Sequence, residues 1–271
     1  MNHPQSSERI VVGIDGSDAA ITAAKWAVAE AISRDIPLRL IHAIPERRPA
    51  QNPGDEPMDI EYGETALRLA SAALNAMGEP VKIEADLVQG PPDTVLVKES
   101  DHAAMICIGS NGIGAIARKV LGSTAESVAK NAHCPVAVIR SIGDSDKPHS
   151  GSIAVVVDES PGNDAVLENG FREARLRQAP ILALGVWRLG LGEIPYEQLN
   201  RRLGRWVNEY REVHVRPAAA RQGATEFLVN AQEDVQLAVV GSNEANHVAR
   251  IVGPHHPHFG HAGCSVLAVR D

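Results

Sequence analysis

The residues best suited to bind a ligand are the glycines and hydroxyl side chains between positions 105 and 124. An apolar run leads into Gly109 and Gly112, and Gly122 then precedes Ser123 and Thr124. Glycine lets the main chain come close to a ligand because it has no Cβ. Exposed N–H groups in such a loop, followed by the first turn of a helix, favour phosphate. This stretch therefore predicts a phosphate-binding loop.

An acidic residue ends the first apolar run of the chain. Asp15 follows residues 10–14 and precedes Gly16 and Ser17. A carboxylate here can accept a hydrogen bond or approach a magnesium ion that phosphates carry with them. Alone, such a residue is often only a cap or a turn residue. Together with the glycine loop, it is predicted to have a functional role.

The chain contains the same plan twice. The run 10–15 matches 153–158 at an offset of 143 residues, and Pro37 matches Pro180 at the same offset. Residues 108–111 match 240–243 at a shorter offset, which indicates deletions in the second copy. Such agreement across several elements indicates internal duplication. We predict two domains, at 1–143 and 151–271, joined by a polar linker.

Apolar runs of strand type alternate with helical patterns in each copy. Strands are expected in the first copy near 9–15, 37–43, 81–88, 103–109 and 134–140, and helices near 18–35, 62–78, 92–101 and 123–132. Nearly continuous apolar strands are typical of a parallel sheet that is covered on both faces. The alternation predicts two doubly wound α/β domains, each with a five-stranded parallel sheet. The proline-rich segment 44–61 is expected to be a surface loop.

Composition excludes several classes of function. The formal net charge is −8, and residues 1–143 alone contain 18 acidic and 13 basic side chains. With neither half basic and an aromatic content of 3%, a nucleic-acid surface is not expected. No apolar run approaches the roughly 20 residues of a membrane span. The three cysteines suit buried positions in a reducing compartment. We expect a soluble, cytoplasmic protein.

These motifs resemble the universal stress protein family in its tandem two-domain form, which is common in mycobacteria. The resemblance rests on residues 12–17, on the glycine spacing from Gly109 to Gly122, and on residues 133–138. It implies an adenine nucleotide alpha-hydrolase-like fold, a role in stress or dormancy, and ATP, with Mg²⁺, bound beyond the carboxyl ends of the strands. It also implies the following nucleotide-binding residues: Asp15, Gly16 and Ser17 beside the nucleotide, the Ala43 backbone at the adenine edge, Gly109 at the ribose, and Gly112, Gly122, Ser123 and Thr124 at the phosphates.

The second copy departs from this pattern. Glu159 stands in place of Gly16, Glu244 in place of Gly112, and Pro254 in place of Ser123. The two glutamates add negative charge where phosphates would lie, and proline removes an N–H donor. We therefore expect one nucleotide site per chain.

Other readings of conspicuous residues have weaker support. Five histidines between 247 and 261 suggest a metal site, but no cysteine or paired carboxylate completes a known spacing, so a solvated loop is favoured. The glycines at 112–114 follow the fourth strand, unlike those of a dinucleotide fold, and no Walker motif occurs. Signatures of hydrolases, metalloproteases and thiol oxidoreductases are also missing. We predict no metal site and no catalytic residues.

Two functions from different classes remain. The leading hypothesis is a regulatory module in which ATP orders the first domain and changes the surface offered to an unidentified protein partner. The alternative is an ATP-independent interaction protein with a vestigial site. A weak ATPase, or slow phosphorylation of Ser123 or Thr124, ranks third. The apolar edges at 136–139 and 266–269 suit an intrachain pseudo-dimer, and a homodimer of whole chains is compatible with it.

Overall fold

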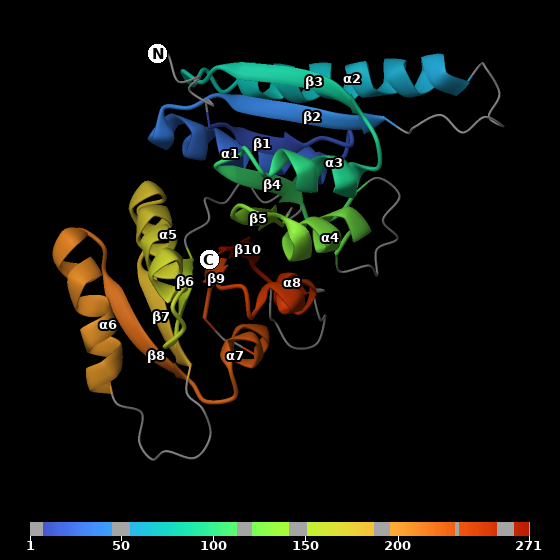
Figure 1. Cartoon of the computed structure of the whole chain (residues 1–271). Coiled ribbons are helices and arrows are strands. Elements are labelled where there is room, and N and C mark those ends of the chain that lie inside the picture. The colour runs from blue at the N-terminus through green and yellow to red at the C-terminus, as the bar shows by residue number, and fades with distance from the viewer. Residues whose placement is uncertain are drawn as a thin grey trace, which may run out of the picture. The chain divides into compact units, whose positions relative to one another are not determined.

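The computed structural model divides the chain into two compact units, Met1–Ser141 (unit 1) and Ile142–Asp271 (unit 2), shown in Figure 1. It describes residues 8–44, 55–112, 121–140, 151–186, 196–230, 233–253 and 263–270. The predicted linker, and all histidines of the cluster except His247, lie outside these ranges.

Unit 1 is a parallel five-stranded sheet with helices between consecutive strands. Its strands are β1 (Ile10–Gly13), β2 (Leu38–Ile44), β3 (Ile83–Gln89), β4 (Met105–Gly109) and β5 (Val136–Ile139), in the order β3-β2-β1-β4-β5. Its helices are α1 (Asp18–Arg34), α2 (Asp55–Asn75), α3 (Pro92–Glu99) and α4 (Ser123–Asn131). The order reverses between β1 and β4. Right-handed crossovers therefore place helices on opposite faces of the sheet and leave a crevice at this switch point.

Unit 2 repeats this topology. Its strands are β6 (Ser152–Val157), β7 (Ile181–Val186), β8 (Val215–Ala220), β9 (Val235–Val240) and β10 (Ser265–Ala268), in the order β10-β9-β6-β7-β8. Its helices are α5 (Asn163–Leu176), α6 (Tyr196–Glu209), α7 (Ala224–Asn230) and α8 (Val248–Val252), with a 3₁₀ turn, η1 (Ala245–His247), before α8. The predicted α/β fold with parallel sheets is confirmed.

The duplication is preserved in fine detail. Helix α1 contains a buried glutamate paired with an arginine one turn later, Glu30–Arg34, at 3.3 Å. Helix α5 contains the same pair, Glu173–Arg177, at 2.8 Å and again 143 residues further on. Such buried carboxylates require partners, because an unpaired buried charge is costly. The same structural solution therefore persists in both copies.

The segment 44–61 is the main difference from the sequence-based expectation. It was expected to be a surface loop, but helix α2 begins at Asp55 within it, while residues 45–54 lie outside the described part. Pro57 falls in the first helical turn. Proline is tolerated there because the N–H groups of that turn have no partner within the helix. Pro57, which lies in the segment predicted to be a loop, is thus part of a helix start.

Helix α1 shows how the sequence positions the crevice. Ser17 is its N-cap, and the Ala20 N–H donates to the Ser17 hydroxyl at 3.2 Å. This bond satisfies one of the free N–H groups at the helix start. The N-terminus of α1 is thereby anchored directly after β1.

None of the helices in the described part of the chain has the length and apolar character needed to span a membrane. The three cysteines, Cys107, Cys134 and Cys264, are buried. Their predicted burial is confirmed. Cys134 precedes β5, however, instead of lying within it.

Candidate nucleotide-binding site

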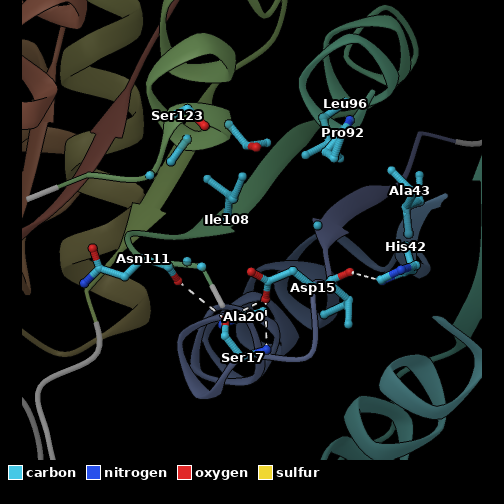
Figure 2. A pocket seen from close by; sticks show the side chains of 18 of the residues that line it. Asp15, Ser17, Ala20, His42, Ala43, Pro92, Leu96, Ile108, Asn111 and Ser123 are labelled. Atoms are coloured by element: carbon cyan, nitrogen blue, oxygen red, sulfur yellow. Dashed lines mark hydrogen bonds between the residues drawn. The ribbon is translucent and has the colours of Figure 1, made fainter. Parts of the chain in front are cut away.

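A cavity of about 550 Å³ lies at the carboxyl ends of the unit 1 strands. Its wall comes from the carboxyl ends of β1, β2 and β4, from the turns after β1 and β4, and from the starts of α3 and α4 (Figure 2). It contains Asp15, Ser17, Ala43, Gly109, Gly112, Gly122, Ser123 and Thr124, which are all of the predicted binding residues except Gly16. The switch point of the sheet is where ligands bind in open α/β folds.

Asp15 is held in a tight turn at one end of this cavity. Its Oδ1 accepts from the Ser17 N–H at 2.9 Å and from the Ser17 hydroxyl at 2.6 Å. Gly16, between them, has a φ of +87°, a conformation that favours glycine. Gly16 therefore shapes the turn and does not form part of the cavity wall. Figure 2 shows Asp15 beside Ser17 and Asn111.

Two glycines after β4 permit close packing around Asp15 and α1. A Cβ built on Gly112 would lie 2.6 Å from the Asp15 Oδ2 atom. A Cβ on Gly109 would lie 2.7 Å from the main-chain carbon of Ala19. Gly109 is thus required by the approach of α1, whatever it does for a ligand. Gly112 thus allows its main chain to lie close to the Asp15 carboxylate, where a side chain would collide with it.

The start of α4 supplies main-chain donors next to this loop. Gly122 is the N-cap residue, in an extended conformation with φ −68° and ψ 147°, and its N–H donates to the Ser110 carbonyl at 2.9 Å. Ser123, Thr124 and Ala125 follow it in the cavity wall. The first N–H groups of a helix lack intrahelical acceptors and carry partial positive charge. They suit an anionic group.

His42 and Tyr62 also line the cavity, and the sequence analysis missed both. The His42 Nδ1 lies 2.7 Å from the Ile14 carbonyl oxygen, so Nδ1 must carry the donated hydrogen. The Tyr62 hydroxyl donates to the Asp15 carbonyl at 2.9 Å, and its ring centroid lies 5.7 Å from that of His42. A polar residue near the carboxyl end of an apolar strand was the available signal for His42. Tyr62 lay at the edge of the segment interpreted as a loop.

Unit 2 keeps the aspartate turn but changes the loop. Asp158 Oδ1 accepts from the Ser160 N–H at 2.9 Å and from the Ser160 hydroxyl at 2.6 Å, as in unit 1. Glu244, in the place of Gly112, has a buried Oε2 atom that finds no hydrogen-bond partner among the described residues. Burial raises the pKa of the Glu244 carboxyl, and the Asp158 charge raises it further. Glu244, one of the residues predicted to exclude ATP, therefore brings a second carboxyl group close to that of Asp158.

The described residues contain no group of three or more metal-ligating side chains that could hold an ion. His247 is exposed at the end of η1. The remaining histidines of the cluster are outside the described ranges, so the predicted absence of a metal site stays a prediction.

Comparison with known proteins gives consistent similarities. Residues 6–140 match the universal stress protein family. A universal stress protein of Mycobacterium tuberculosis is 50% identical over 262 residues, covering 96% of both chains. A second one from the same organism is 38% identical over 279 residues, covering 100% of this chain and 99% of the other. The crystal structure of a universal stress protein from Archaeoglobus fulgidus superposes with a TM-score of 0.72 at 15% identity, covering 97% and 98% of the chains. That last likeness concerns the fold.

Proposed function

Since the chain belongs to the universal stress protein family, we propose that unit 1 binds ATP and that the protein is a nucleotide-dependent regulatory module of the stress response. The main support comes from the close approach of Gly112 to Asp15. The backbone of Gly112 lies so close to the Asp15 carboxylate that even a single added carbon would collide with it. The N-terminus of α4 lies beside Gly112, because a Cβ on Gly122 would lie 3.8 Å from the Gly112 nitrogen. An anionic ligand with an attached cation suits that pairing of carboxylate and N–H donors.

Each part of the wall suits one part of the nucleotide. The Ala43 backbone, near the carboxyl end of β2, is proposed to meet the adenine edge, with Pro92 and Leu96 as apolar wall residues. The N–H groups at Ser123 and Thr124 are proposed to hold the phosphates. The described wall contains no lysine or arginine. Main-chain dipoles and Mg²⁺, for which Asp15 is the proposed protein ligand, are proposed to offset the charge of the triphosphate.

Binding is favoured over catalysis by the side chains present. The titratable groups of the described wall are Asp15, His42 and Tyr62. Each of them already makes a hydrogen bond within the protein. Hydrolysis and phosphorylation of Ser123 or Thr124 are therefore proposed to be slow at most. Steady phosphate release over many turnovers would contradict this part of the proposal.

The sharpest test replaces Ser123 by proline, the residue type that occupies the corresponding place in unit 2. Ser123 is the first residue of α4, where proline is tolerated, and the extended conformation of Gly122 is one that precedes proline readily. Ser123→Pro thus removes one N–H donor while preserving the helix. A hydrogen bond to a charged group contributes about 1.5–3 kcal/mol, so ATP affinity should fall about tenfold or more. Isothermal titration calorimetry with Mg·ATP measures it.

A second variant places a side chain between Gly112 and the Asp15 carboxylate. Gly112→Glu should abolish the rise in melting temperature that Mg·ATP produces, because its side chain occupies the space beside Asp15. The matched control is Glu244→Gly in unit 2, which should leave the ATP response of unit 1 unchanged. Melting without nucleotide reports whether each variant folds. An undiminished ATP response in both Ser123→Pro and Gly112→Glu would contradict the proposal and favour an ATP-independent interaction protein.

A further inference from the structure

Helix α2 exposes a regular row of apolar and small side chains. The helix packs against β2, β3 and α1 through Gly63, Ala66, Leu67, Ala70 and Leu74, all of which are buried (Figure 1). On its outer face, Met58 is 69% exposed, Tyr62 48% and Leu69 58%. We call this row the α2 stripe; its members are Met58, Tyr62, Thr65, Leu69, Ala72 and Ala76. Ala76 follows the last residue of α2 but continues the pattern, since its N–H donates to the Ala72 carbonyl at 3.0 Å.

The spacing of the α2 stripe is that of a helix–helix contact. Successive members are four, three, four, three and four residues apart. That alternation is the seam of a two-helix coiled coil, in which such residues face a partner helix. The core of unit 1 does not bury these positions, because another face of α2 already packs on the sheet; of the stripe, Tyr62 also contacts unit 1, through the hydrogen bond from its hydroxyl to the Asp15 carbonyl. The seam is therefore available for a partner outside unit 1.

The stripe is complementary to itself when it runs in the opposite direction. The large residues Met58 and Tyr62 lie in its first half, and the small residues Ala72 and Ala76 lie in its second half. An antiparallel pair of α2 helices places Met58 opposite Ala76 and Tyr62 opposite Ala72 of the second copy. At the centre, Thr65 meets Leu69 of the second copy. Large residues thus meet small ones along the whole seam, as close packing requires. We propose that α2 forms an antiparallel contact between two copies of this chain.

The charged residues beside the α2 stripe also favour the antiparallel direction. Glu61, Glu64 and Arg68 are exposed and flank the stripe on one side. In an antiparallel pair the same flanks face each other, so Arg68 lies near Glu64 of the second copy, and this pair occurs twice. A parallel pair would bring this flank against the opposite one, where Asp59 is exposed. Opposite charges at these flanking positions determine orientation in coiled coils. Within one chain, Arg68 donates to the nearby Thr65 hydroxyl at 3.0 Å.

The size of the surface sets the expected strength. The stripe is about 27 Å long at 1.5 Å per residue, and a helix is about 10 Å wide, so it offers roughly 270 Å² per chain. Stable interfaces bury about 800 Å² per partner. The contact should therefore be weak and dependent on concentration. Sedimentation at increasing concentration should show the average mass rising from 28.9 kDa towards twice that value.

Cysteine cross-linking tests the surface and the direction together. In the full-length double variant Thr65→Cys with Leu69→Cys, the antiparallel contact brings each new thiol next to the other one in the second copy. Oxidation should yield a covalent dimer in the double variant and little in either single variant. The three native cysteines are buried, so they contribute little background. A covalent dimer formed equally well by Leu69→Cys alone would overturn the antiparallel arrangement.

A charge variant tests whether the stripe is needed at all. Leu69→Glu should keep the mass at that of the monomer at every concentration, because a carboxylate would be buried in the seam. Val207→Glu is the matched control, since Val207 is 40% exposed on α6 of unit 2 and should not affect the contact. Two results would overturn the proposal: a wild-type chain that stays monomeric throughout, which leaves the stripe to another partner, or a dimer that Leu69→Glu does not weaken.

Discussion

Glu244 is a residue whose position carries an energetic cost. Its buried Oε2 has no hydrogen-bond partner in the part of the chain that the structure describes, and both burial and the Asp158 charge raise the pKa of its carboxyl. The folded protein therefore binds this proton more tightly than the unfolded chain, whose pKa is about 4.5. Stability is then lost as pH rises from that value through the folded pKa. A loop that in unit 1 leaves space for a ligand is, in unit 2, occupied by a charge that destabilises it.

Glu244→Gln should remove this cost. The variant should be more stable than the wild type at about pH 8, by roughly 1 kcal/mol, which is typical for relief of an unsatisfied buried group. The difference should shrink as pH falls below about 4.5, because the wild-type carboxyl then becomes protonated in both states. Thermal unfolding across this pH range checks it. Glu159→Gln, at an exposed position in the same crevice, is the control and should show no such pH-dependent gain.

The turn before the first helix of each unit shows which part of its stability comes from capping the helix and which from the aspartate turn. Ser17 and Ser160 bond to their aspartates at equal distances, but only Ser17 caps a helix, because the N-cap of α5 is Gly162. Ser17→Ala should therefore lower the free energy of unfolding by about 1 kcal/mol, and Ser160→Ala by less. Denaturant unfolding of both variants measures the difference. Equal losses would show that the aspartate turn, and not the cap, is what stabilises.

The strands could be predicted from the sequence, whereas the start of α2 and part of the cavity wall could not. The strands were predicted because they are buried on both faces and read as unbroken apolar runs, as β4 does. The start of α2 was missed because Pro57 has the same local signature in a loop and in a first helical turn. His42 and Tyr62 were missed because they meet only when α2 folds back over β2. Local sequence encodes the elements, whereas the wall of the site depends on contacts between segments distant in the chain.

For the whole molecule, the asymmetry between the units predicts a local response to nucleotide. Mg·ATP should slow hydrogen exchange in peptides from unit 1, above all those containing residues 13–17 and 121–126, because a ligand stabilises the state that binds it. Peptides from the corresponding turn and loop of unit 2, at 156–160 and 241–245, should change little. Mass spectrometry of exchanged peptides makes this comparison within one sample. Equal protection of both sets would contradict the expectation of one nucleotide site per chain.

The aspartate turn has a further consequence for how a ligand arrives. Unit 2 retains the turn at Asp158 even though Glu244 replaces the loop glycine. Both hydrogen bonds of that turn join Asp158 to Ser160, so the turn does not depend on the loop. The Asp15 carboxylate is in this sense preorganised, and fixing it costs little entropy when a cation or phosphate docks. Association at this end of the crevice should then be a rapid encounter with a rigid group. If stopped-flow traces contain a slow phase, its origin should be sought in segments other than this turn.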